Sequence, residues 1–195
     1  MSLTLTTPPI DRPVSVGSLK KWARIDADND EQNALLSDLI TLSSQWISTY
    51  TGKAVMESTY TWRIDGFRSS DSVLLLPNPP TTSVSSVRYK QQSDGALTAF
   101  TDFETDLESH PARIYPAYGY TWPLTRRTPN AVEVVYVSGY EDRSDLPREL
   151  RMGILMLATY LYENPDEGSG NFQESRGMPT LLKQILGPQT LLEVY

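Results

Sequence analysis

The feature that most constrains the fold is a long amphipathic stretch between Asp28 and Lys53. Its apolar residues recur at steps of one, three, four and seven, which places them on one face of a helix with about 3.6 residues per turn. They are Leu35, Leu36, Leu39, Ile40, Trp46, Ile47 and Tyr50. An isolated helix gains little stability in water, so this face must pack against a partner. The sequence therefore predicts a core helix over residues 29–51.

Both ends of this helix carry terminating signals. Asp28, with Glu31 three residues later, is typical of a capping box, and Asp30 adds negative charge near unpaired N–H groups. Gly52 occupies the position of a left-handed cap, and Lys53 follows it near the last carbonyls.

The same aspartates, with Asp26, resemble the first ligands of an EF-hand loop. Its sixth position is Glu31 instead of glycine, and its twelfth is Ser37 instead of glutamate. Capping is therefore the favoured interpretation.

A second long helix is predicted over residues 147–163, and a short one over 15–25. Ser144 or Asp145 could cap the second long helix, and Pro147 suits its first turn. Its apolar spacing makes it the natural partner of the first long helix. The expected core pair is Leu36, Leu39, Ile40, Trp46 and Ile47 against Leu150, Ile154, Leu157 and Leu161.

Between the helices, residues 54–139 favour β-branched and aromatic side chains interrupted by Pro, Gly and Asp. Val132, Val134 and Tyr136 alternate onto one face of a strand. Short links between successive strands predict an antiparallel sheet inserted into an antiparallel helical core, an α+β fold. The predicted strands are 57–65, 72–76, 83–89, 96–103, 112–115 and 131–137.

The two ends are predicted to be arms. Residues 1–14 contain three prolines and suggest a mobile N-terminal arm, whereas residues 15–164 form the main domain. Residues 165–195 suggest a flexible linker followed by an apolar segment that docks onto a partner. Its apolar residues are Met178, Leu181, Leu182, Ile185, Leu186, Leu191, Leu192, Val194 and Tyr195.

Composition narrows the function classes. The 195 residues carry a formal charge of −7, which disfavours binding of nucleic acid through a basic surface. Without cysteines the chain forms no disulfide, thiolate nucleophile or cysteine-ligated zinc site. No apolar run is long enough for a membrane span and no secretory signal begins the chain, so we expect a soluble protein of a reducing compartment.

Candidate catalytic and phosphate-binding residues are sparse. His110, the one histidine, lies in a predicted loop, and no Gly-x-Ser-x-Gly motif accompanies it. The sequence Thr51-Gly52-Lys53 resembles the end of a phosphate loop but lacks the first glycine and follows a helix. A solvated histidine and a helix end are the favoured interpretations.

Arginines and aromatic residues in the β region leave two interpretations open. Arg126 and Arg127, with Arg143 further on, could meet phosphate or serve as surface and interface charges. A group of aromatic residues could be core beneath the sheet or interface anchors; it comprises Tyr115, Tyr118, Tyr120, Trp122 and Tyr140. The chosen subunit-interface candidates are Tyr118, Tyr120, Trp122, Arg126 and Arg127.

The order of these motifs resembles the head–tail connector (adaptor) family of long-tailed bacteriophages, whose relatives also occur in gene-transfer particles. The resemblance covers roughly residues 15–164. It rests on 19–26 (LKKWARID), 50–53 (YTGK), 61–67 (TWRIDGF), 74–80 (LLLPNPP), 83–89 (SVSSVRY), 111–114 (PARI), 122–123 (WP), 134–140 (VVYVSGY), 146–147 (LP) and 160–164 (YLYEN).

The resemblance implies a structural virion protein, not an enzyme, with no cofactor and no catalytic residue. Such proteins assemble in the bacterial host cytoplasm, usually as twelve copies, into a ring under the portal protein. The ring extends the DNA channel, lets the genomic DNA pass through without sequence-specific binding, and offers a docking surface to the next head-completion (stopper) or tail protein. No membrane partner is implied. The apolar residues from Met178 to Tyr195 would be the portal-docking arm.

Two other function classes remain open. The chain could be a monomeric α+β protein-binding module that holds a peptide or regulator through its Tyr/Trp loops. It could also be a hydrolase that uses His110 with an Asp or Ser.

Overall fold

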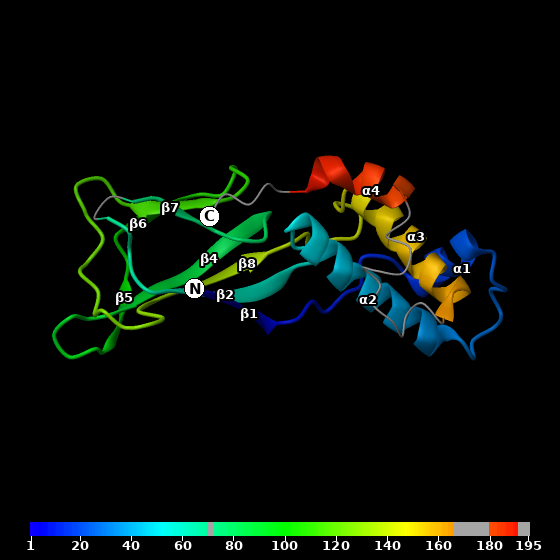
Figure 1. Cartoon of the computed structure of the whole chain (residues 1–195), viewed down its shortest axis with the longest axis horizontal. Coiled ribbons are helices and arrows are strands. Elements are labelled where there is room, and N and C mark those ends of the chain that lie inside the picture. Colours follow the sequence, from blue (N-terminus) through cyan, green and yellow to red (C-terminus); the bar gives the residue numbers. More distant parts are fainter. Residues whose placement is uncertain (70–71, 166–179, 191–195) are drawn as a thin grey trace. The chain divides into compact units, whose positions relative to one another are not determined.

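The computed structural model describes residues 1–69, 72–165 and 180–190. The chain divides into two compact units, each assembled from two separate stretches of sequence. Unit 1 comprises residues 1–10 and 57–139, and unit 2 comprises residues 11–56 and the described residues from 140 onward. Unit 1 holds the strands and unit 2 the helices (Figure 1), which confirms the predicted α+β class.

Unit 2 is built from α1 (Val16–Ala23), α2 (Asn33–Thr51), α3 (Arg148–Glu163) and α4 (Thr180–Leu186), followed by a 3-10 turn, η2 (Gly187–Gln189). In Figure 1, α2 and α3 lie side by side and run in opposite directions. Ser15 caps α1, because its Oγ accepts a hydrogen bond from the Ser18 N–H at 3.1 Å. Gly52 ends α2 with φ of 68°, as predicted.

The predicted N-terminal caps of the two long helices are wrong. The N-cap of α2 is Gln32, which makes no side-chain cap bond, because residues 26–30 form turns of their own. In these turns the Asp28 N–H donates to Asp26 Oδ1 at 3.2 Å. The N-cap of α3 is Pro147, which leaves Ser144 and Asp145 too far upstream to cap it.

The core of unit 2 lies between α2 and α3 and extends to α1 and α4. All four core residues predicted on α3 are buried in it, as are Leu36, Ile40 and Ile47 on α2. Leu39 and Trp46 pack against it half-buried, and Trp46 stacks on Tyr50 with ring centroids 5.1 Å apart. Burial of these aliphatic side chains supplies the main stabilising term of the unit.

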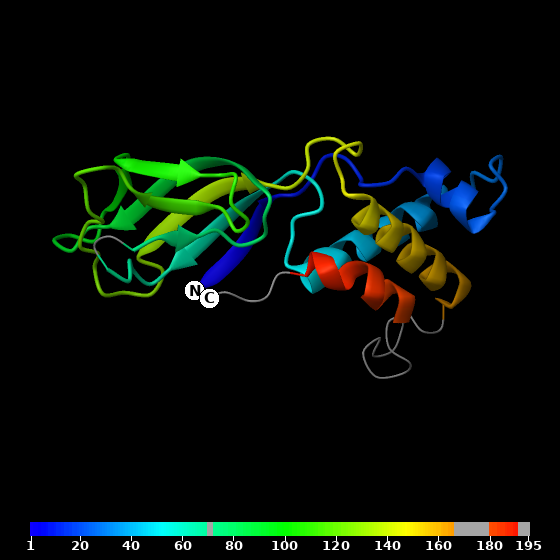
Figure 2. The same cartoon turned by 90° about the horizontal axis from the view of Figure 1, so that it is seen from above.

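Unit 1 contains two antiparallel sheets. The five-stranded sheet has the order β1-β2-β8-β4-β5, and the three-stranded sheet has the order β3-β7-β6. Figures 1 and 2 show the smaller sheet lying against the larger one. The larger sheet comprises β1 (Ser2–Thr7), β2 (Ser58–Ile64), β8 (Val132–Ser138), β4 (Thr81–Lys90) and β5 (Leu97–Phe100), and the smaller comprises β3 (Leu74–Leu75), β7 (Arg113–Pro116) and β6 (Phe103–Asp106).

Alternation in β8 follows the prediction. Val132, Val134 and Tyr136 are fully buried, and the residues between them are half-exposed. The Tyr136 hydroxyl donates to the Pro77 carbonyl at 2.9 Å, which satisfies its polar end inside the core.

Two predictions for unit 1 are wrong. Residues 2–7 of the expected mobile arm form β1, which pairs antiparallel with β2. The alternating Leu and Thr residues of this stretch favour a strand, which the three prolines nearby obscured. The single strand predicted over 96–103 is two, β5 and β6, because residues 101–102 carry the chain from one sheet to the other.

Candidate interaction surfaces

Helix α4 packs onto α3 at Gly153, a position that we call the α4 seat. Leu182 and Leu186 of α4 are fully buried there. A Cβ atom at Gly153 would lie 3.1 Å from Leu186 Cδ2 and 3.2 Å from Ile47 Cδ1, so any larger residue would push these side chains away by a few tenths of an ångström or more. Leu182 and Leu186 are therefore core residues, which corrects their assignment to a free docking arm.

The other residues of the predicted docking arm are only partly placed. Leu181 is exposed on α4 and Ile185 is half-buried. Five more lie outside the described residues, as does the predicted linker over 166–177; they are Met178, Leu191, Leu192, Val194 and Tyr195.

A hydrogen bond also fixes the turn that follows α4. Lys53 Nζ, just beyond the end of α2, donates to Gln189 Oε1 at 2.8 Å. Partial burial of the ammonium group lowers the pKa of Lys53, since desolvation disfavours its charged form. Lys53 thus anchors the end of η2 and does not serve a phosphate loop.

The predicted interface aromatics lie in the loop over residues 117–130, which we call the aromatic loop, and they differ in burial. Tyr118 is 99% exposed, and Tyr120 is also exposed. Trp122 is buried, its Nε1 donates to the Ser72 carbonyl at 2.6 Å, and its ring stacks on Phe67 with centroids 4.4 Å apart. Trp122 is therefore a core residue of unit 1, which corrects its assignment to a subunit interface.

The three candidate arginines have different surroundings. Arg126 lies over the β4–β5 turn, where its Nη1 donates to the Asp94 carbonyl at 3.1 Å and approaches Gly95 closely. Arg143 donates to the Arg12 carbonyl at 2.6 Å and pairs with Asp11 at 3.1 Å. Arg127 is exposed. These contacts give Arg126 and Arg143 structural roles within their own units.

Tyr140 and Tyr115 are half-buried. Tyr140 packs against the core of unit 2, and burial of its hydroxyl raises its pKa. Tyr115 lies on β7 in unit 1.

His110 is exposed in the loop between β6 and β7. A triad would require a carboxylate that orients the imidazole and a serine that it holds. The described residues place neither group within hydrogen-bonding distance of it. Within the same residues, no three acidic or histidine side chains are grouped as metal ligands.

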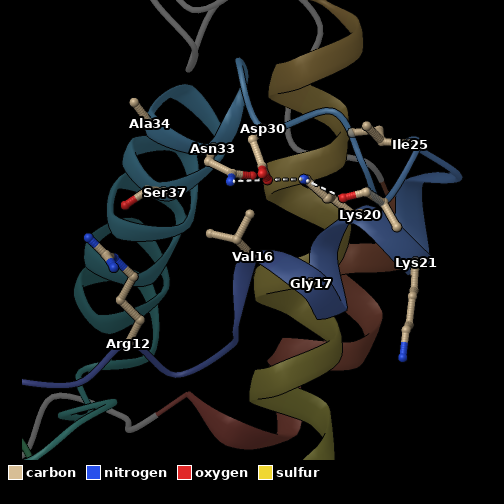
Figure 3. A pocket seen from close by; sticks show the side chains of 11 residues that line it. Arg12, Val16, Gly17, Lys20, Lys21, Ile25, Asp30, Asn33, Ala34 and Ser37 are labelled. Carbon is tan, nitrogen blue, oxygen red and sulfur yellow. Dashed lines mark hydrogen bonds and ion pairs between the residues drawn. The ribbon is translucent and has the colours of Figure 1, made fainter.

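An open hollow of about 620 Å³ lies between α1, α2 and the turns that join them (Figure 3). Lys20 is buried at its edge and donates to the Ala27 carbonyl at 3.0 Å and, more weakly, to Asp30 Oδ1 at 3.5 Å. Asn33 Nδ2 donates to the same carboxylate at 2.7 Å, and this bond, aided by Lys20, lowers the pKa of Asp30. The polar groups of the hollow hold the α1–α2 turns in place, and they form no nucleophile–base pair.

Sequence reasoning missed β1, one of the two edge strands of the larger sheet. Leu3 and Leu5 on β1 and Leu97 on β5 are exposed at its two edges. The pattern Leu3-Thr4-Leu5 is the signal that could have revealed β1. None of the helices in the described ranges combines the length and apolar character of a membrane span.

Comparison with solved structures finds matches that cover the whole chain, three of which come from gene transfer agent particles. A chain of the neck of an empty gene transfer agent (GTA) particle, solved with C6 symmetry, matches with a TM-score of 0.79, 20% identity and coverage of 100% of this chain and 98% of that one. A chain of the virion of a native GTA particle matches with a TM-score of 0.77, 19% identity and the same coverage.

A chain of the neck of a native GTA particle, solved with C12 symmetry, matches with a TM-score of 0.71, 20% identity and again 100% and 98% coverage. At this identity the likeness establishes a shared fold. A scan against family models and a search of curated proteins find no match.

Proposed function

We propose that this chain is a structural virion protein of the head–tail neck, an adaptor that assembles as a ring under the portal. The observation that carries the proposal is the agreement of fold with GTA neck chains along the entire length of both chains. An agreement that includes both units leaves no part of the chain to be explained by a different architecture.

The proposed ring has about twelve copies and extends the DNA channel between the portal and the next head-completion or tail protein. A ring requires heterologous contacts, in which one surface of a subunit meets a different surface of its neighbour. Exposed Tyr118, Tyr120 and Arg127 are residue types that suit such contacts. The net charge of −7 would let DNA slide through without adhering.

We further propose that the exposed face of α4, with Leu181, belongs to the surface that meets the portal. The buried face with Leu182 and Leu186 would only position it. In this proposal the protein acts without a cofactor and resides in the virion after assembly in the host cytoplasm.

The test is electron microscopy of particles made without this chain. We expect full-size heads that lose their DNA and carry no tails, and restored tails when the chain is supplied in trans. Normally tailed particles in its absence would refute the proposal.

The exposure of Tyr118 also fits a monomeric protein-binding module. Mixing the purified chain with isolated portal rings separates the two functions. An adaptor co-sediments with the rings as a multi-copy complex, whereas a monomeric module of another system stays in the supernatant.

A further inference from the structure

Within the part of the chain that the structure describes, no strand pairs with the outer edge of β1 or of β5 in the larger sheet of unit 1. Edge strands β1 and β5 contain no charged residue and no proline. Leu5 on β1 is 48% exposed and Leu97 on β5 is 47% exposed. Sheet edges usually carry charges, prolines or a covering element that prevents pairing with another chain.

The smaller sheet, by contrast, is charged at one of its two edges. Its edge strand β6 carries Glu104 and Asp106 and is flanked by Asp102 and Glu108. These carboxylates repel a second copy of the same edge and the phosphates of DNA. β1 has no cation that would attract DNA or an acidic peptide, so its uncharged edge is suited to another uncharged strand.

Strand direction then restricts how two copies can join. Every neighbouring pair in the order β1-β2-β8-β4-β5 is antiparallel, so the first and fifth strands run in the same direction. In a ring, adjacent copies differ by a rotation about the ring axis, which brings β1 of one copy to β5 of the next in a parallel arrangement. A two-fold dimer would instead pair β1 with β1.

The side chains at the two edges also match. Leu3 and Leu5 lie opposite Trp62 and Tyr60, on the buried face of the sheet. Phe100 lies opposite Val87 on that same face, because Val87 in turn lies opposite Val134. Parallel pairing would set Leu5 beside Phe100 and continue the apolar face across the boundary.

We propose that β1 of each subunit adds in parallel to β5 of its neighbour, so that the ring carries a hydrogen-bonded sheet across every subunit boundary. The occupant of the β1 edge is a second copy of this chain. The inference rests on the proposed ring function and names the surface that forms it.

The absence of cysteine from the chain allows a direct test. Thr4→Cys with Ala99→Cys places two thiols side by side on the outer face of the proposed pair. Oxidation of particles that contain this double variant should give a covalent ladder that ends in a closed ring. Each single variant, and the control pair Thr4→Cys with Glu104→Cys, should give no ladder.

A second pair of variants covers the case in which the double variant is not incorporated. Leu5→Lys adds a charge to the edge and should reduce incorporation into particles at least tenfold. The matched control is Leu42→Lys on α2, where the leucine is 50% exposed, and it should incorporate normally. Circular dichroism melts establish that both variants are folded.

The outcomes are distinct. Incorporation of the double variant without a ladder, a dimer from Thr4→Cys alone, or normal incorporation of Leu5→Lys would overturn the strand pairing and leave the proposed function standing. Absence of the unmodified chain from purified particles would refute the proposed function itself.

Discussion

At the scale of single residues, the Asp106 side chain fixes the loop that follows β6. Ser109 Oγ donates to its carboxylate at 2.6 Å, and the Ser109 N–H donates at 3.2 Å. These bonds favour the charged form and lower the pKa of Asp106, the hydroxyl bond most of all. The loop that carries His110 is thus fixed by a neighbouring carboxylate and not by the imidazole.

Ser109→Ala should raise the pKa of Asp106 toward its ordinary value of 3.8. Because the folded-state pKa is the lower one, this contribution to stability is complete above the unfolded-state pKa and is lost as the pH falls through the folded value. Carboxyl carbon NMR measures the pKa directly. Denaturation should show the variant less stable than the parent at pH 7 and equal to it in strong acid; an unchanged pKa would contradict the assignment.

Single residues also show what the sequence could predict. Val132, Val134 and Tyr136 were placed correctly because a strand puts alternate residues on one face, which is a local rule. Trp122 was misplaced because its partners Phe67 and Phe100 come from other parts of the chain. An aromatic residue in a loop suits a core and an interface equally until such partners are known.

At the scale of elements, the α4 seat accounts for the position of a short helix. Seven residues form a weak helix by themselves, so α4 depends on the burial of Leu182 and Leu186 at Gly153. The periodicity of α4 was evident in the sequence, and its seat was not, because a glycine within α3 signals only a loss of helix propensity.

Gly153→Leu should fill the α4 seat and release α4. Trypsin should then cleave after Lys183, on α4, several times faster than in the parent chain, as measured by mass spectrometry of timed digests. Met152→Leu places the same side chain one position earlier, on the exposed side of α3, and should leave the rate unchanged. Equal cleavage in all three chains would show that α4 does not depend on the seat.

The N-terminal cap of α2 also shows that a local sequence motif does not by itself determine where a helix begins. Asp28 and Glu31 have the residue types and the spacing of a capping box. The turns between α1 and α2 use Asp26 and Asp30 instead, and Asp30 is held by Lys20 from α1. The contact between Lys20 and Asp30 thus takes the place of the predicted capping box, and α2 begins at Asn33.

At the scale of the whole molecule, each unit has a core of its own. The hydrophobic cluster around Leu36 and Ile154 contains residues of unit 2 alone. Val134 is buried in unit 1. The sequence predicted helices flanking an inserted sheet, and it did not reveal that residues 2–7 join the sheet, since strand pairing over that separation has no local signal.

Val134→Ala and Ile154→Ala test the independence of the two cores. Each should lower the free energy of unfolding by about 2 to 4 kcal/mol, the usual loss for a truncated core side chain. The double variant should lose the sum within about 0.5 kcal/mol, because the two residues belong to different units. Denaturant titrations measure all four chains, and a larger departure from additivity would show that the cores are coupled.

The interleaved order of the two units also affects how the chain is made. The ribosome completes α2 long before α3, so Leu36, Ile40 and Ile47 leave the exit tunnel without the helix that covers them. β1 likewise leaves the ribosome before β2, the strand with which it pairs. A nascent chain halted before Arg148 would therefore expose the apolar face of α2 to solvent. We expect chaperones to bind this face until synthesis passes Glu163 and α3 can cover it.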